Sequence, residues 1–243
     1  MEGQFCVQHP PCSYKERCCQ GEKPFLPPYA IARQGKRAVY DREAIHGILD
    51  VGLVAHVGFL AGEEGFIRPM VMPMAYARDG ETLYIHGAAS TRMIRNIDEG
   101  APLCLTVTHV DGIVAARSSF NHSMNYRCAV VHGIARAVTD PDEQKRALAL
   151  ITEHLLPGRM EEVRDHLPRE LAATGVLAVS IDAASAKIRN APPAEARPED
   201  YELQVWGGVV PVVTGLGQPL DDGRLAPGTK LPPSLAAARQ KFS

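Results

Sequence analysis

The feature that most constrains this chain is a series of short apolar runs, rich in β-branched residues, separated by turn signals. Residues 51–60, 67–76 and 82–86 form three such runs. Asp79-Gly80, between the second and third, is a strong hairpin signal because glycine adopts the positive φ that a tight turn requires. The second run contains two prolines, which cannot donate to a sheet ladder. It therefore predicts a strand at the edge of a sheet.

The same strand pattern continues along the chain. Residues 103–109 and 113–117 predict a second hairpin around Asp111-Gly112, and residues 126–138 and 176–181 predict two further strands. Five or six strands joined by tight turns favour a closed antiparallel barrel with added helices. A doubly wound parallel sheet is disfavoured, because strands and helices seldom alternate here.

Three helices are expected around these strands. Asp41 predicts the N-cap of a helix whose apolar stripe runs through Leu49. A short helix is predicted over residues 91–98. A third begins at Asp140-Pro141, with proline at its first position, and runs through His154.

Composition divides the chain into three parts. Residues 1–35 contain two Pro-Pro pairs and no sustained period, so we expect an irregular, cysteine-containing extension. Residues 36–214 hold the predicted strands and form the expected folded domain. Residues 215–243 are rich in Gly, Pro and Asp and predict a surface tail.

The overall composition narrows the class of protein. With 45% hydrophobic residues among 243, the chain can bury a sizeable core, and its net charge of −2 gives no general attraction to nucleic acid or to an anionic membrane. No apolar run reaches 18 residues, so no membrane span is expected. The N-terminus also lacks the apolar stretch of a secretory signal.

Four of the six cysteines crowd the first 19 residues instead of being spread through the fold, which favours a reduced, cytoplasmic protein. Their spacing matches no familiar zinc motif, so we expect no metal site there. The role of this group in metal binding or in a response to oxidants stays open. The group consists of Cys6, His9, Cys12, Cys18 and Cys19.

The segment with the clearest chemical signal is residues 83–97, where a predicted strand runs through small residues into a helix start. Small residues let the backbone approach an anion, and a helix start offers free N–H groups and a partial positive charge. Ser90, Thr91 and Arg92 stand at this start, and arginine can form two parallel hydrogen bonds to phosphate. Two interpretations are equally open: a phosphate cradle, or a capped helix with arginines facing solvent.

Two further segments carry candidate residues. Polar residues gather between apolar strands in residues 115–133, which is typical of a site, although an ordinary polar loop explains the pattern slightly better. Trp206, the only tryptophan, precedes two glycines and is suited to lie against a planar ring, although tryptophan more often serves in packing. His86 ends a strand beside the candidate phosphate turn, where a lone histidine is more often structural than catalytic.

At these segments the chain resembles the FMN-binding split-barrel superfamily related to pyridoxamine 5′-phosphate oxidase. It is most similar to the branch of flavin-nucleotide-binding proteins, alongside the nitroimidazole-resistance reductases. The resemblance covers about residues 37–212. The resembling stretches are residues 45–59, 69–76, 83–92, 104–127, 185–193 and 205–211.

The resemblance implies a mainly β fold: a six-stranded antiparallel split β-barrel with peripheral helices, forming a homodimer with one FMN at each of two interface sites. It implies that Ser90, Thr91 and Arg92 hold the FMN phosphate and that His86 lies near the flavin as the candidate catalytic residue. The other residues implied to contact the flavin are Pro69, Met70, Val71, Met72, Pro73, Met74, Ser123, Asn125, Tyr126, Arg127 and Trp206.

The function implied by this resemblance is that of an FMN-dependent oxidoreductase, which takes electrons from reduced nicotinamide and passes them to a small acceptor. The arginine–histidine and pyridoxal-phosphate-binding motifs of true pyridoxamine-phosphate oxidases are missing, so oxidation of vitamin B6 is not expected. The alternative is a non-catalytic carrier or sensor of flavin or haem with the same fold. The deazaflavin F420 is not excluded by these motifs.

Overall fold

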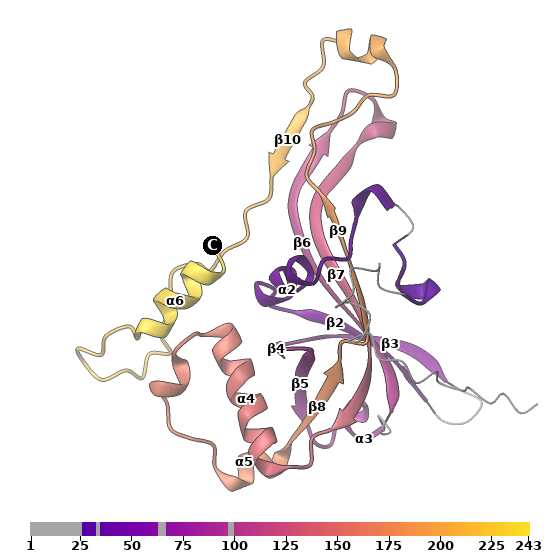
Figure 1. Cartoon of the computed structure of the whole chain (residues 1–243). Coiled ribbons are helices and arrows are strands. Elements are labelled where there is room, and N and C mark those ends of the chain that lie inside the picture. The colour runs from indigo at the N-terminus through magenta and orange to yellow at the C-terminus, as the bar shows by residue number, and fades with distance from the viewer. Residues whose placement is uncertain (1–25, 33–34, 63–66, 97–99) are drawn as a thin grey trace, which may run out of the picture.

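The computed structural model describes residues 26–32, 35–62, 67–96 and 100–243, with only the backbone of Arg92 and Asn96. The N-terminal group of cysteines and His9 lies outside these residues. The described part is mainly an antiparallel sheet with a few helices packed around it (Figure 1).

The ten strands in the described residues belong to one sheet. Its main path runs β3-β2-β6-β7-β8-β5-β4, while β10 joins β6, β9 joins β7, and β1 joins β9. The strands are β1 (Ala38–Val39), β2 (Ala55–Ala61), β3 (Arg68–Met74), β4 (Tyr76–Asp79), β5 (Thr82–Ala88), β6 (Ala101–Ala115), β7 (Ser123–Ala137), β8 (Thr174–Ser180), β9 (Ala183–Arg189) and β10 (Gly208–Pro211).

The two long strands β6 and β7 form a central ribbon that divides the sheet. At one end, β2 pairs with residues 104–106 of β6, and β8 pairs with residues 135–137 of β7. At the other end, β10 pairs with residues 112–115 of β6, and β9 pairs with residues 126–132 of β7. The ribbon thus leaves the barrel body as an arm flanked by β10 and β9 (Figure 1), and the fold is a split β-barrel with peripheral helices.

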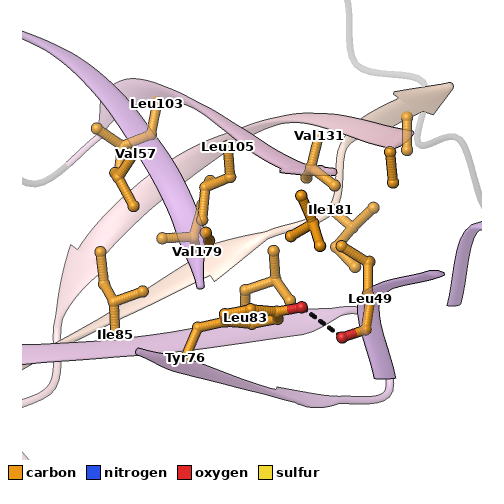
Figure 2. Packing of buried hydrophobic residues seen from close by; sticks show 14 of the residues in the cluster. Leu49, Val57, Tyr76, Leu83, Ile85, Leu103, Leu105, Val131, Val179 and Ile181 are labelled. Atoms are coloured by element: carbon orange, nitrogen blue, oxygen red, sulfur yellow. Dashed lines mark hydrogen bonds between the residues drawn. The ribbon is translucent and has the colours of Figure 1, made fainter. Parts of the chain in front are cut away.

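The core fills the interior of the barrel body with side chains from alternate strand positions. Val57, Leu83, Leu105 and Val179 are among its fully buried members (Figure 2). The Tyr76 hydroxyl, also fully buried, donates a hydrogen bond to the main-chain carbonyl at residue 49. This bond fastens the first long helix to the barrel.

The α-helices lie outside the sheet. Asp41 caps α2 by accepting a 2.9 Å hydrogen bond from the N–H of Ala44, and Asp140 caps α4 by accepting from the N–H of Asp142. A second apolar cluster lies between α4 and the outer face of β5 and β8. No helix in the described ranges has both the length and the hydropathy to cross a bilayer. The helices are α2 (Arg42–Asp50), α3 (Arg92–Asn96), α4 (Pro141–Leu155), α5 (Pro168–Ala173) and α6 (Pro233–Lys241).

Several local predictions are confirmed. Asp41 and Asp140 begin helices, and Gly80 forms the tight β4–β5 turn with φ +57°. The proline-containing run becomes β3 at one end of the strand order, and its outer edge pairs with no described strand. The predicted strand over 51–60 begins later, at Ala55, because the preceding residues form the loop that leaves α2.

The hairpin predicted at Asp111-Gly112 is wrong. β6 runs through both residues, and its pairing with β7 shifts register between Val110 and Gly112 as a β-bulge. Glycine is needed there for close approach: a Cβ on Gly112 would lie 2.9 Å from a methyl carbon of Val209 on β10. Strand pairing from far along the chain thus overrides the local turn signal.

The C-terminal part contains elements that the sequence patterns did not predict. β9, β10, α5 and α6 lie among residues rich in proline, alanine and glycine, where the hydrophobic period is weak. Within the predicted tail, α6 buries Ser234 and Ala238.

Candidate functional site

The turn between β5 and α3 is built on two glycines that face each other. Gly87 of β5 pairs with Gly175 of β8. A Cβ on Gly175 would lie 2.2 Å from Cγ2 of Ile94, and a Cβ on Gly87 would lie 3.5 Å from Oγ1 of Thr91. The absence of side chains at these positions therefore lets α3 pack directly on the sheet.

Of the residues predicted to hold a phosphate, Ser90 and Thr91 lie in this turn with exposed side chains. The N–H of Thr91 donates a 2.8 Å hydrogen bond to the carbonyl of Ala88, and the N–H of Ala89 donates to the carbonyl of Ala173. Arg92 opens α3, and its side chain lies outside the described residues. The turn is thus anchored by its backbone and presents its two hydroxyl side chains to solvent.

His86 lies in β5 beside this turn but faces the other side of the strand. Successive strand residues point to opposite faces, so its ring lies opposite the Gly87–Thr91 side. Burial lowers the pKa of His86, which keeps the imidazole neutral at pH 7. Its Nδ1 is buried and makes no hydrogen bond within the described residues.

Strand β3 presents an open apolar surface. Residues Pro69–Met72 are exposed on both faces of the strand, and Val71 is 65% exposed. An apolar pocket of about 320 Å³ lies between this strand and its neighbours. Its lining comprises Gly58, Phe59, Leu60, Pro69, Met70, Val71, Pro102, Leu103, Cys104 and His132.

Cys104 and His132 are members of this pocket that sequence reasoning did not single out for a site. They sit opposite each other on β6 and β7. Burial raises the pKa of the Cys104 thiol and lowers the pKa of His132. The ring of Tyr29 packs edge-on against His132, with the centroids 4.9 Å apart.

The remaining predicted residues lie on the arm. Asn125 is only 4% exposed, and its Oδ1 accepts hydrogen bonds from the N–H of Ala191 and from the guanidinium of Arg189. The guanidinium of Arg127 forms a 2.9 Å ion pair with Asp111, which raises the pKa of Arg127. In this chain both side chains therefore hold the arm together.

The other arm residues are freer. Ser123 and Tyr126 are partly buried at the start of β7, and Trp206 is 65% exposed beside the start of β10. One chain does not bring this group to the β5–α3 turn. Tyr126 and Ala137 are separated by about 35 Å of extended strand, and Ala137 pairs with β8 two positions from Gly175.

A larger pocket of about 640 Å³ lies where β6 is unpaired between β2 and β10, and we name it the split pocket. The α2–β2 loop, the segment after β10 and the end of α6 complete its walls. Its lining comprises Val51, Gly52, Leu53, Val54, His56, Val107, Thr108, His109, Val110, Asp111, Arg127, Val212, Val213, Thr214, Lys241, Phe242 and Ser243.

The polar groups of the split pocket are partly engaged. The Nε2–H of His109 donates a 3.1 Å hydrogen bond to the carbonyl of Ile48. Asp111 pairs with Arg127 as described above, and burial lowers the pKa of Lys241. The ring of His56, on the exposed face of β2, makes no hydrogen bond to a described residue. Across the described ranges, no three His, Cys, Asp or Glu side chains gather as a metal-binding group.

A β-dominant split barrel with peripheral helices is the class of fold that these elements define. The model of the family described as pyridoxamine 5′-phosphate oxidase matches residues 41–188, and the chain belongs to this family of flavin-binding split barrels. Comparison with curated proteins gives no match.

Three solved structures illustrate the similarity. The flavocytochrome Anf3 from Azotobacter vinelandii is 32% identical, with a TM-score of 0.78 over 87% of this chain and 96% of that one. The FAD and heme binding protein from Mycobacterium smegmatis is 36% identical, with a TM-score of 0.77 over 84% and 97%. A 5-nitroimidazole antibiotic resistance protein from Bacteroides thetaiotaomicron (22% identical, TM-score 0.50, 62% and 86%) shares the fold.

Proposed function

We propose that this protein is a homodimeric flavin-dependent oxidoreductase that takes electrons from reduced nicotinamide and passes them to a small acceptor. The observation that carries the proposal is its similarity, over more than four fifths of its length, to two proteins named as a flavocytochrome and as an FAD and heme binding protein. A bound flavin would supply the redox chemistry, while the protein binds and orients it.

The described residues fit such a cofactor. The β5–α3 turn has small residues through which a phosphate can approach the backbone, together with the exposed hydroxyls of Ser90 and Thr91. Strand β3 offers an open apolar face for a flat ring.

The separation of the two groups of predicted residues supports the dimer in this proposal. The β5–α3 turn belongs to the barrel body, whereas Tyr126 and Trp206 belong to the arm. A single flavin contacts both groups when the arm of the second copy reaches the barrel body of the first. In this proposal Trp206, which is largely exposed in one chain, covers the ring in the other.

The identity of the flavin is part of the proposal. The family resemblance in the sequence favours FMN, and the name of the Mycobacterium smegmatis relative favours FAD as the alternative. Acid release of the cofactor, followed by chromatography against both standards, separates the two.

A second candidate function has its own support: the protein binds haem beside its flavin. The two structures named above that exceed 30% identity carry haem or cytochrome in their names. The split pocket, with a volume of about 640 Å³, falls in the range of roughly 300–1,000 Å³ that is usual for cofactor sites.

The visible spectrum of the purified dimer, followed by anaerobic addition of reduced nicotinamide, tests the proposal. Rapid bleaching of a flavin band and reoxidation by an added acceptor are expected. A flavin that stays oxidised under an excess of reduced nicotinamide contradicts the oxidoreductase and favours a non-catalytic carrier. A purified protein that neither retains nor takes up flavin contradicts the whole proposal.

The phosphate turn is tested separately by Arg92→Ala. Loss of a charged hydrogen bond to phosphate should weaken flavin binding by about 1.5–3 kcal/mol, measured by quenching of flavin fluorescence. Arg239→Ala, an exposed arginine on α6, is the matched control and should bind flavin normally. Unchanged affinity in Arg92→Ala would place the phosphate elsewhere.

A further inference from the structure

We propose that the split pocket is the haem site and that His56 is an axial ligand of the iron. This inference rests on the haem half of the proposed function, and it adds the location and the ligand. Four features of the pocket support it: an opening in the sheet, apolar walls, an imidazole without a hydrogen bond to any described residue, and basic side chains among its lining.

The opening exists because β6 has different partners at its two ends. β2 pairs with β6 up to Thr106, and β10 begins to pair at Gly112, so residues 107–110 have a free edge on that side. Consecutive residues of β6 line the pocket although they belong to opposite faces of the strand. The pocket therefore extends through the gap in the sheet beside residues 107–110, and a flat molecule can lie edge-on in this gap.

The walls of this gap are mostly aliphatic, which suits a porphyrin ring. They include side chains from four separate segments, so that apolar atoms face the gap from several sides. The apolar lining residues are Val51, Leu53, Val54, Val107, Val110, Val212, Val213 and Phe242.

The two histidines of the pocket differ in what they can offer to iron. The Nε2–H of His109 is used by the carbonyl of Ile48. That bond leaves only Nδ1 of His109, which is crowded by the Cβ of its own residue and is therefore poorly placed for the plane of a haem. His56 is exposed to the pocket and its ring nitrogens make no hydrogen bond to described residues, so its Nε2 is free to coordinate.

Basic side chains stand among the lining. The carboxylate of Asp111 accepts hydrogen bonds from Nε and Nη2 of Arg127, while Nη1 of Arg127 donates to no described residue. The ammonium of Lys241 donates to the carbonyl of His154 and lies 3.4 Å from Nδ1 of the same residue, which leaves one of its three N–H donors. Haem carries two propionates, which such groups bind by charge-assisted hydrogen bonds.

The position of His56 also connects this site with the proposed flavin site. His56 on β2 is paired directly with Pro73 on β3, the strand proposed to line the flavin ring. Paired strand residues have Cβ atoms about 5 Å apart. Haem on His56 would therefore lie next to the flavin strand, which suits transfer of electrons between the two groups.

Haem titration of the full-length dimer, with flavin content measured in the same samples, tests the inference. The wild type and the control His122→Ala, an exposed histidine at the tip of the arm, should give the same Soret band at one haem per chain. His109→Ala should keep the ligand-field signature of the iron ligand in the visible and EPR spectra. His56→Ala should bind haem at least tenfold more weakly and lose the ligand-field signature in the visible and EPR spectra. Added imidazole should restore that signature.

A second variant, Val110→Trp, fills the pocket while keeping both histidines and should also weaken haem binding. Wild-type haem affinity in His56→Ala or in Val110→Trp, or loss of the iron ligand in His109→Ala, would overturn the assignment. A wild type that binds flavin but no haem would overturn both this inference and the haem half of the proposed function, while leaving the flavin half standing. Unchanged flavin content in His56→Ala excludes a failure to fold.

Discussion

The ammonium of Lys241 donates a 2.6 Å hydrogen bond to the main-chain carbonyl of His154, which fastens the end of α6 to the end of α4. The ring of His154 lies between Phe242 and Tyr76, and its Nε2–H donates a 2.6 Å hydrogen bond to the carbonyl of Gly52. These contacts join the C-terminal segment to the α2–β2 loop. They therefore hold two opposing walls of the split pocket in place.

Phe242→Ala should remove much of this attachment. The side chain is only 8% exposed, and truncation of a buried phenylalanine costs about 3 kcal/mol. Urea denaturation should show the loss in the free energy of unfolding. Lys230→Ala, an exposed residue in the segment before α6, is the control and should stay within about 0.5 kcal/mol of the wild type. Equal midpoints for the two variants would mean that the C-terminal segment adds nothing to stability.

Stability should fall as the pH is lowered from about 7 toward 5. Burial lowers the pKa of His154 below its usual value near 6.5, despite the opposing hydrogen bond to the Gly52 carbonyl. Below pH 6.5 the unfolded chain then binds a proton that the folded chain does not, so acid favours unfolding. Burial also lowers the pKa of His86 and His132, which adds to the slope.

His154→Gln isolates the contribution of this ring, because an amide N–H can still reach the Gly52 carbonyl without titrating. The free energy of unfolding, measured at several pH values between 7 and 5, should depend less on pH in this variant than in the wild type. His122→Gln, at the exposed tip of the arm, should keep the wild-type slope. A His154→Gln slope as steep as that of the wild type contradicts the assignment.

Gly175→Ala should displace α3 and so disturb the β5–α3 turn. The added Cβ would meet Ile94 at 2.2 Å, so α3 must shift outward. Overpacking of this kind costs about 1–3 kcal/mol, and flavin affinity should fall with it if the turn holds the phosphate. Gly47→Ala on α2 is the control: a Cβ there meets no atom within 4 Å, and alanine favours the helix by up to about 1 kcal/mol. A Gly175→Ala variant that is destabilised but binds flavin with normal affinity would mean that the turn does not hold the flavin phosphate.

Local signals in the sequence predicted the elements whose cause is local. Asp41 and Asp140 cap helices through their own side chains, and Gly80 turns a hairpin with a backbone that glycine favours. The dipeptide Asp111-Gly112 carries the same signal as Asp79-Gly80, yet it lies inside a continuous strand. Its conformation is set by pairing with β7 on one side and with β10, about 100 residues further along the chain, on the other.

The split pocket was beyond prediction for a related reason. Its lining comes from residues 51–54, 56, 107–111, 127, 212–214 and 241–243, and only the fold brings these segments together. Its valines look like core residues in the sequence, because a free strand edge has no compositional mark. The gap depends on where β2 ends and β10 begins, and strand boundaries are the least predictable feature of a sequence.

The arm provides the last prediction, through the carboxylate of Glu195. This group accepts hydrogen bonds from the N–H of Arg117 at 2.5 Å, from Oγ of Ser118 at 3.1 Å and from Nδ2 of Asn121 at 3.3 Å. The same donors lower the pKa of Glu195. One side chain thus ties the segment that follows β6 to the segment that follows β9.

Glu195→Ala should loosen the tip of the arm around Arg117, because the N–H of Arg117 and the side chains of Ser118 and Asn121 lose their shared acceptor. Trypsin should then cleave after Arg117 several-fold faster than in the wild type, as measured by mass spectrometry of the released peptides. Glu199→Ala, which removes only an exposed ion pair with Arg197, should leave the rate unchanged. If the arm of one copy reaches the flavin of the other, flavin affinity should fall in Glu195→Ala alone. Faster cleavage with unchanged affinity would mean that the tip takes no part in binding.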